Sequence, residues 1–473
     1  MYNVIFYDKV KEITTTENVT IRNYNDDGTY SETVEAQEIT KKYRVPTKFI
    51  FDTATNCDRM LYNFSVLDDF KADMPSLNSA ISMFEGSSIT SLEGAKGGSA
   101  EFISLTSADR MFKDCSELVS LNINAPSLVS TEEFVDNCTA LQTVSGSLKN
   151  LVDGTNMFKS LSELNIFSAS LESLENGSGM FAFTSLSTFS PGLLSLKTGT
   201  EMFMESALTI FDKKLPSLIT ADSMFENCLN LTIVNIQCPV LETADKMFKG
   251  SSIESITLNA PKLTSAIDMF SGIVTEGAAH NNLVSFNGNL SSLIYGDNMF
   301  ADSALTSFNV TDLSNLKSAE NMMGTVQFES WNIDLPSLES GYNMFSSRYV
   351  SEEETVYPAL VSFESDLSAL INGNNMFKDC INLKHFNAPL PSLENGFDMF
   401  TNCKLDAESA MFIAESLPYY QETEAQFITL GINCASSDAD AFFASTGLYT
   451  NFNDFKQRLY DKGWNLMIVY NPE

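Results

Sequence analysis

Apolar residues recur along most of the chain in a fixed order that begins again every 22 or 23 residues. In one copy a Met-Phe pair starts at Met224, Cys228 follows four residues later, and Val234 lies in a short alternating segment. Pro239 closes that segment, and at Met247 the order starts again. A segment with so few apolar residues cannot bury its own hydrophobic edge, so successive copies must stack on one another. The pattern therefore predicts a solenoid.

Fifteen such starts can be aligned on the Met of the Met-Phe pair or on its replacement. They are Met60, Met83, Met111, Phe134, Met157, Met180, Met202, Met224, Met247, Met269, Met299, Met322, Met344, Met376 and Met399. Three intervals are longer than the rest: those after Met83, Met269 and Met344. Insertions in a solenoid lie in loops on defined faces. We therefore expect two inserted loops, near 273–282 and 346–358, to project from one edge.

Within each copy, alternation separates the two faces of a short strand. The inward positions are Leu121, Phe189, Val234, Ile256, Phe286, Phe308, Trp331, Phe363 and Phe386. One outward row is Ser91, Ser120, Thr143, Thr188, Ser255, Ser285, Ser307, Ser330 and Ser362, and a second is Asn122, Asn235, Asn287, Asn309, Asn332 and Asn387. These rows predict a flat surface of hydroxyl and amide groups along a parallel sheet.

The two ends of the chain do not follow the repeat. Residues 1–59 alternate in a strand-like way at 3–6, 19–23 and 43–51, and Asn25–Gly28 has the composition of a hairpin turn. We interpret 1–59 as a β-rich N-terminal cap or attachment segment. It precedes a mainly β leucine-rich-repeat solenoid of about 15 coils, which we place at 60–405.

The C-terminal part, 406–473, is interpreted as an α/β cap on the last coil. Residues 406–417 have helical spacing and 426–432 read as a strand. A second helix is expected over 453–462 and a final strand over 464–470.

Composition excludes several classes of partner. The chain has 28 basic and 61 acidic residues, a net charge of −33, which repels nucleic acid and anionic membranes. No apolar run approaches the roughly 20 residues that a membrane span needs. The first residues lack a basic segment followed by a long apolar one, so we expect no secretory signal.

No catalytic constellation is visible. The two histidines, His280 and His385, lie far apart in the repeat count, and we expect both to be exposed without a role. Nucleotide-binding loops and zinc motifs are absent. A glycan-active enzyme would need clustered carboxylates in a groove, and the Ser and Asn rows offer no repeated pair. We therefore expect no enzymatic activity, cofactor or metal site.

Cysteines recur at the fourth position after the Met. They are Cys115, Cys138, Cys228, Cys380 and Cys403, and Ser206, Ser251 and Ser303 take the same place in other copies. A small side chain is therefore what this position requires. Adjacent coils would bring two of these pairs to a distance that permits a disulfide, but buried reduced thiols are the favoured interpretation.

Two sets of residues are candidate partner-binding sites. Ile166, Ile210 and Ile233 replace Ser or Thr in the outward row. The alternative is that they are scattered exposed apolar residues. Tyr349, Glu352, Glu353, Glu354 and Tyr357 combine aromatic and acidic groups in the second inserted loop. The alternative there is that the glutamates only solvate the loop.

The repeat resembles a known family. The order Phe-x-x-Cys-x-x-Leu-x-x-Ile/Leu followed by Pro and Leu resembles the BspA-like leucine-rich repeats, and Met-Phe is similar to the start of a mycoplasma surface-protein repeat. The resemblance covers Met60 to about Leu405. The tail around Lys462–Trp464 resembles the ends of leucine-rich-repeat proteins from gut bacteria and their tailed phages.

The resemblance implies a non-catalytic binding or scaffolding protein. Surface members of the bacterial family carry secretion signals, whereas virion proteins fold in the host cytoplasm without one. We therefore expect a phage virion protein of a tail, tail fibre or other appendage, which contacts other virion proteins or the host surface and can form homo-oligomers. The alternative is a bacterial surface adhesin that binds host protein or glycan.

Overall fold

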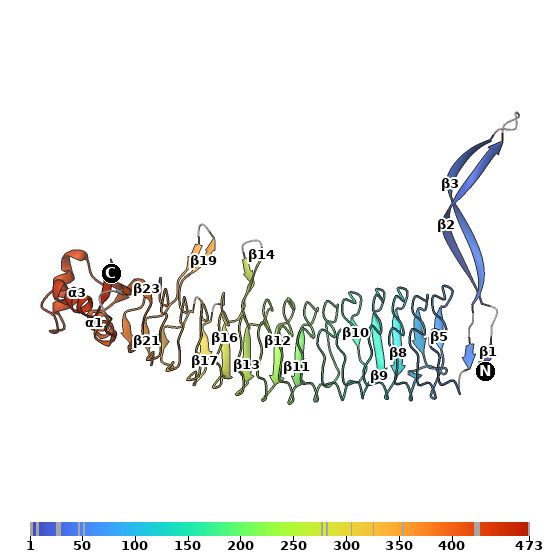
Figure 1. The fold of residues 1–473 in the computed structure, drawn as a ribbon, viewed down its shortest axis with the longest axis horizontal. Coiled ribbons are helices and arrows are strands. Elements are labelled where there is room, and N and C mark those ends of the chain that lie inside the picture. The colour runs from blue at the N-terminus through green and yellow to red at the C-terminus, as the bar shows by residue number, and fades with distance from the viewer. Residues whose placement is uncertain are drawn as a thin grey trace. The chain divides into compact units, whose positions relative to one another are not determined.

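The computed structural model describes residues 3–5, 9–24, 30–45, 48–50, 53–275, 278–280, 282–303, 305–324, 326–351, 354–420 and 426–471. The chain divides into two compact units: Met1–Val152 with Leu161–Leu171, and Asp153–Ser160 with Glu172–Glu473. Both units contain stacked coils (Figure 1). The solenoid that the repeat predicts is therefore confirmed.

Short parallel strands run through the coils of the first unit. They are β5 (Asp69–Lys71), β6 (Ser91–Glu93), β7 (Ala100–Glu101), β8 (Ser120–Asn124), β9 (Thr143–Ser147) and β10 (Ile166–Phe167). They pair in the order β10-β9-β8-β6-β5, and β7 also pairs with β8. Ser120 pairs with Ser91 on one side and with Thr143 on the other, so equivalent positions of successive coils align.

Two antiparallel pairs precede the coils. β1 (Asn3–Ile5) pairs with β4 (Lys48–Ile50), and β2 (Lys9–Tyr24) pairs with β3 (Tyr30–Val45). The expected strands are present, but β2 and β3 are much longer than the alternation indicated. The Thr-rich middle of β2 favours strand without alternating, and β3 pairs with β2 along its whole length. The turn expected at Asn25–Gly28 lies outside the described residues.

The coils of the second unit carry a further set of parallel strands. They are β11 (Ile210–Lys214), β12 (Ile233–Gln237), β13 (Ser255–Asn259), β16 (Ser285–Asn289), β17 (Ser307–Asn309), β18 (Ser330–Trp331), β21 (Ser362–Glu364) and β22 (His385–Asn387). They pair as β11-β12, β13-β16-β17 and β18-β21-β22. The single sheet that we expected is thus divided into shorter segments.

A second ladder joins the same coils on another side. One residue of each coil, four positions before the Met, forms a parallel bridge with its equivalent in the next coil. In the second unit this row includes Asn176, Thr198, Thr220, Thr243, Ser265, Tyr295, Ser318, Ser340, Asn372 and Asn395. Within a sheet segment of the second unit, a coil is therefore joined to its neighbours along two lines, and between segments the second ladder continues.

The Met-Phe pairs form the core. From Met83 onward, each residue of these pairs is at most 4% exposed, whereas Met60 is partly exposed. In the second unit the rings stack in a column: the centroid of Phe225 lies 5.6 Å from that of Phe203 and 5.5 Å from that of Phe248. The strand residue Phe211 meets Phe225 at 4.7 Å with its ring steeply inclined. Both geometries are favourable for aromatic pairs.

The predicted inward residues are buried, with two exceptions. Val234 and Phe308 are only half-buried. Val234 lies on β12 and Phe308 on β17, each of which is the last strand of its sheet segment. Phe308 nevertheless stacks on Trp331 of the following coil, with the ring centroids 5.7 Å apart.

Left-handed backbone conformations shape the turns of most coils. They occur at the residue before the Met and at the third residue after it, for example Ser223 (φ 55°) and Asn227 (φ 59°). Asn, Asp, Ser and Gly fill most of these places, as the left-handed region favours. The bulkier exceptions are Arg59, Arg110, Glu133, Phe183, Glu201, Glu205 and Lys246.

The position three residues before the Met is Gly or Ala in all copies except two, which have Cys57 and Thr131, and close packing between coils favours this small size. A Cβ atom on Gly177 would lie 2.9 Å from the sulfur of Met202, in the next coil. The same contact recurs at Gly154 with Met180. The Met of each following coil therefore fills the space that a larger side chain would need.

Several residues at the cysteine position donate a side-chain hydrogen bond, although Phe64, Leu161 and Val326 occupy it in other copies. The thiol of Cys228 donates to the carbonyl oxygen of Phe203 in the preceding coil at 3.0 Å, and Cys138 donates to Phe112 at 2.9 Å. Ser303 donates instead to the carbonyl of Phe300 in its own coil. All five of these cysteines are buried and unpaired.

The two inserted loops form small hairpins. β14 (Ile273–Thr275) pairs with β15 (Ala278–His280), and β19 (Arg348–Ser351) pairs with β20 (Glu354–Val356). Both project from the same edge of the second unit (Figure 1). The expected position of the insertions is therefore confirmed.

The C-terminal elements agree with the predicted helices and strands to within one residue. They are β23 (Gly396–Leu405), α1 (Ala407–Ser416), β24 (Gln426–Ile432), the 3-10 turn η2 (Ser436–Asp438), α2 (Ala439–Ala444), α3 (Phe452–Asp461) and β25 (Trp464–Tyr470). The short α2 was not predicted. β23, which contains the last Met-Phe pair, pairs with β24, so the last coil continues directly into the sheet β23-β24-β25. In the part of the chain that is described, no helix has the length and apolar character of a membrane span.

Three consecutive residues hold the segment that follows α1. Lys462 is 2% exposed, and its ammonium group donates to the carbonyl oxygens of Ala414, Glu415 and Leu417 at 2.7–3.0 Å. Gly463 has φ of 83°, which favours glycine, and the indole of Trp464 donates to a nearby carbonyl. Burial lowers the pKa of Lys462, while the C-terminal end of the α1 dipole favours its positive charge.

Candidate functional site

The strand face of the second unit carries the two polar rows that the alternation predicts. None of the expected outward Ser, Thr or Asn residues is buried. Ser285 pairs with Ser255 and with Ser307, and Asn287 pairs with Asn309, so equivalent groups repeat from strand to strand. Neighbouring strands lie about 4.8 Å apart, which sets the spacing of these groups. The surface thus presents hydrogen-bonding groups at regular intervals.

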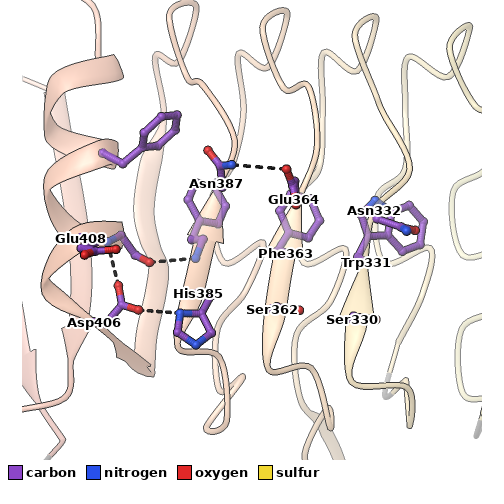
Figure 2. A pocket seen from close by; sticks show the side chains of 13 residues that line it. Ser330, Trp331, Asn332, Ser362, Phe363, Glu364, His385, Asn387, Asp406 and Glu408 are labelled. Atoms are coloured by element: carbon purple, nitrogen blue, oxygen red, sulfur yellow. Dashed lines mark hydrogen bonds and ion pairs between the residues drawn. The ribbon is translucent and has the colours of Figure 1, made fainter.

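A groove of about 530 Å³ lies at the C-terminal end of this face. Its floor belongs to three adjacent strands, β18, β21 and β22, and the start of α1 forms one wall (Figure 2). The polar residues that line it are Ser330, Asn332, Ser362, Glu364, His385, Asn387, Asp406, Glu408 and Ser409. Beneath them, Trp331, Phe363 and Phe386 belong to the stacked aromatic core.

Helix α1 is fixed over the groove by contacts to the last strand. Asp406 caps the helix by accepting the backbone N–H of Ser409 at 2.8 Å. The hydroxyl of Ser409 accepts the N–H of Phe386 at 2.9 Å and donates to the carbonyl of Lys384 at 3.2 Å. The helix thereby satisfies backbone groups at the edge of β22, and the groove wall is rigidly placed.

His385 and Asp406 are in contact at one side of the groove. Nδ1 of His385 lies 2.6 Å from a carboxylate oxygen of Asp406 (Figure 2). The histidine side chain is 66% exposed, as its place in the outward row predicts. His385 thus contacts a residue that also caps α1, and the expectation that the histidine has no role in function stays a prediction.

Three carboxylates, from Glu364, Asp406 and Glu408, line this groove. The Ser and Asn rows did not predict this cluster, because Asp406 and Glu408 lie after the last copy of the repeat. Asp406 is engaged with His385 and the N-terminus of α1, and Glu364 accepts a hydrogen bond from the amide of Asn387 at 3.5 Å (Figure 2). Glu408 is exposed in the first turn of α1.

Aromatic surface is also available in the groove. The ring of Phe412, one turn after Glu408 on α1, lines the groove and is 38% exposed. A second shallow hollow of about 530 Å³ lies further along the strand face, where Ile233 and Asn235 lie beside Asn287 and Asn309. The strand face therefore has two hollows with related linings.

The structure brings together only part of the predicted isoleucine strip. Ile210 and Ile233 are register partners on β11 and β12, and their side chains are 50% and 55% exposed. Ile166 is 56% exposed and pairs with Thr143 in the first unit. The exposure of all three is confirmed, and their role stays a prediction.

The other predicted partner-binding set belongs to the hairpin β19–β20. Tyr349 lies on β19, Glu354 on β20, and Tyr357 just beyond it with its side chain 43% exposed. Glu352 and Glu353 lie outside the described residues. The role of this set in binding stays a prediction.

Neither metal nor catalytic chemistry is indicated by the arrangement. Among the residues whose side chains are described, no group of three or more His, Cys, Asp or Glu could hold a metal ion. The groove thus offers hydrogen-bond donors and acceptors, with one exposed ring, to a ligand. The contacts between α1 and β22 could not be predicted from the repeat, although the helix start at Asp406 directly after the last copy was a usable signal.

Comparison with known proteins identifies the repeat. The sequence matches the family model of the BspA type leucine rich repeat region (6 copies) over residues 80–209 and 197–326. Together the two matches span residues 80 to 326, 247 of the 473 residues. No curated protein matches the sequence.

Two solved structures are similar to the chain. A leucine-rich repeat protein from Bacteroides ovatus is 14% identical, covers 96% of this chain and 98% of its own, and has a TM-score of 0.38. A leucine rich cell surface protein from Faecalibacterium prausnitzii is 12% identical, covers 80% of this chain and 94% of its own, and has a TM-score of 0.21.

Proposed function

Because the chain belongs to the BspA type leucine-rich repeat family, we propose that it is a non-catalytic binding protein of a bacterial cell surface. The groove between the strand face and α1 is its principal ligand site. The observation that carries the proposal is the lining of this groove, which combines paired donors and acceptors with one exposed ring. The bacterial surface is the setting that the family resemblance implies.

The chemistry of the groove fits a neutral glycan. Sugar hydroxyls donate and accept at once, as do the hydroxyl of Ser362 and the amides of Asn332 and Asn387. The apolar face of a sugar ring can pack on the exposed part of Phe412. Carboxylates in the groove, together with the net charge of −33, disfavour acidic glycans and phosphates. The strand spacing of about 4.8 Å is similar to the length of one pyranose ring.

Binding without hydrolysis is the proposed mode. Glycosidases use two carboxyl groups that flank the scissile bond, one as acid and one as base or nucleophile. The carboxylate of Asp406 already contacts His385 and caps the N-terminus of α1, which favours a structural role for it. Glu364 and Asn387 are adjacent on the groove floor and can bind neighbouring hydroxyls.

A glycan array screened with the full chain tests this proposal, followed by calorimetric titration of the neutral glycans that bind. Replacing Asn332, Glu364 and Asn387 together by Ala removes the polar floor. Three lost hydrogen bonds should weaken binding about 100-fold, at about 1 kcal/mol each. A matched control replaces the exposed ion pair Lys317–Glu339, which lies beside the second ladder, by Ala. The control should bind like the wild type.

Two outcomes would contradict the proposed ligand. One is that no neutral glycan binds while a host protein does, and the other is that the groove variant binds as tightly as the control. Release of reducing ends from a bound glycan, lost in Glu364→Gln or Glu408→Gln, would show an enzyme instead.

The expected location in a phage virion gains no support from the family match, which fits the bacterial alternative better. Antibody labelling of intact producing cells, combined with mass spectrometry of purified phage particles from the same source, separates the two. We expect labelled cells and no chain in the particles. The reverse result would restore the virion role.

A further inference from the structure

The hairpin β2–β3 is a long two-stranded ribbon. Each strand has 16 residues, and they pair without a break from Lys9 opposite Val45 to Tyr24 opposite Tyr30. Strands in proteins are usually about 5–6 residues long, and an isolated two-stranded hairpin is at best marginally stable in water. Among the described strands, neither β2 nor β3 pairs with a third. Each therefore presents an outer edge of backbone donors and acceptors, which readily pairs with another strand.

The charges along β3 are segregated. Glu32, Glu35 and Glu38 occupy its first half, and Lys41, Lys42 and Arg44 occupy its second half. This is unusual in a chain with only 28 basic residues and a net charge of −33.

The register of the ribbon reinforces this segregation. Lys9 and Lys11 of β2 pair at the same end as Lys42 and Arg44 of β3. The formal net charge of that end is +4, from Lys9, Lys11, Lys41, Lys42 and Arg44 together with Glu12. The formal net charge of the rest of the ribbon is −3, from Glu17, Glu32, Glu35 and Glu38 together with Arg22. The ribbon thus has a basic end and an acidic end.

Such a ribbon is complementary to a second copy that runs in the opposite direction. Opposite charges on neighbouring strands are stabilising and like charges directly opposite are destabilising. Parallel association of two β3 strands would set like charges side by side, whereas antiparallel association sets the acidic half of each against the basic half of the other. A two-fold axis centred on Thr40, for example, places Glu38 of each copy opposite the second copy's Lys42 and pairs the two Thr40 residues.

The same argument selects β3 rather than β2. In β2 the acidic residues Glu12 and Glu17 lie between Lys9 and Lys11 on one side and Arg22 on the other. No antiparallel register of two β2 strands brings both acidic residues opposite basic ones. A pair of β2 strands could still place Glu17 opposite the second copy's Lys11, so β3 is favoured because its three acidic and three basic residues lie in separate halves.

We propose that two copies of this chain associate through β3, which pairs antiparallel with the β3 of the second copy to form a four-stranded sheet in the order β2-β3-β3-β2. The contact is two-fold symmetric, so it closes as a dimer and does not grow into a fibre. A dimer would carry two copies of each ligand site and bind a multivalent surface more tightly than one chain. The proposal is independent of the ligand bound in the groove.

Charge reversal of each half of β3 tests the proposal on the full chain. Variant A carries Glu32→Lys, Glu35→Lys and Glu38→Lys. Variant B carries Lys41→Glu, Lys42→Glu and Arg44→Glu. We expect the wild type to be a dimer by light scattering coupled to size-exclusion chromatography. Each variant alone should dissociate, with a dissociation constant raised at least about tenfold, because like charges now meet.

Mixing A with B restores complementarity, since one β3 is then basic throughout and the other acidic. We expect an A–B dimer in the mixture, and we expect added salt to weaken it. This arm shows that both variants keep the hairpin. A control that replaces three exposed glutamates of the coils, Glu163, Glu172 and Glu242, by Lys should remain a dimer. A monomeric wild type, dimers in both variants, or no association of A with B would each overturn the proposal.

Discussion

The coils and the C-terminal elements of the second unit are stabilised in different ways. In the coils, one position is filled by different residues in different copies: Met323 takes the place of the core Phe, and Ser303 that of the Cys. After α1, by contrast, Lys462, Gly463 and Trp464 each make a contact that occurs once. Stability is therefore distributed in the coils and concentrated at a few residues near the C-terminus.

The largest expected effect tests whether a coil depends on the size of its core ring. Phe225 is fully buried between Phe203 and Phe248. Phe225→Ala should lower the free energy of unfolding by about 3–5 kcal/mol, because it leaves a cavity in the column. Urea denaturation followed by circular dichroism measures this. The matched variant Phe225→Met, which copies Met323, should cost less than about 1.5 kcal/mol. Equal losses would show that the column does not depend on filled volume.

The second prediction concerns the concentrated contacts. Lys462→Met leaves three carbonyl oxygens near the end of α1 without their charged donor, so we expect a local loss of about 3 kcal/mol. Trp464 fluorescence during denaturation, in a Trp331→Phe background, reports this region. Lys456→Met, at an exposed lysine of α3, is the control and should change little. If the two variants behaved alike, the proposed difference between the regions would be wrong.

A third, smaller effect shows whether the cysteine position depends on the side chain's hydrogen bond or on its small volume. Cys228→Ala should lower the unfolding free energy by about 1 kcal/mol, because the carbonyl of Phe203 loses its thiol donor. Cys228→Ser, which keeps a donor and copies Ser206 of the preceding coil, should retain most of the stability. Thermal denaturation of the two variants compares them directly. A Ser variant as unstable as the Ala variant would indicate that only apolar packing matters.

The smallest effect is a pH dependence of the C-terminal region. Arg458 donates to Glu415 and, with Tyr449, holds the pKa of this carboxyl at about 2. Because the folded pKa is depressed, the stabilisation is present above the ordinary glutamate pKa, roughly 4.3, and is lost as the pH falls towards 2. The pair is partly exposed, so the contribution is modest. The thermal midpoint of the wild type should fall more than that of Glu415→Gln between pH 5 and pH 2.5. Parallel pH profiles would contradict this.

The sequence predicted what the repeat controls. Burial of the Met-Phe pairs, the outward Ser and Asn rows and the bounds of α1, β24 and β25 follow from periodicity, and the structure confirms them. The partial exposure of Val234 and Phe308 was missed, because alternation marks a position as inward but does not show how closely the neighbouring coils cover it.

The groove was also missed, for a different reason. Its wall is a helix and its floor consists of strands from earlier coils, so Asp406 reaches His385 across a contact between two kinds of element. Periodicity relates residues that occupy equivalent places in successive copies. Periodicity carries no information about a contact that is made once, so it does not predict the groove.

The left-handed residues that flank the Met-Phe pair have a consequence for how such a gene changes length. Because most copies carry both bends within their own 22 or 23 residues, a duplicated segment brings its entire path with it. Unequal recombination between copies can therefore add or remove whole coils and still give a chain that folds. Variation in array length is the evolutionary freedom that this backbone geometry provides.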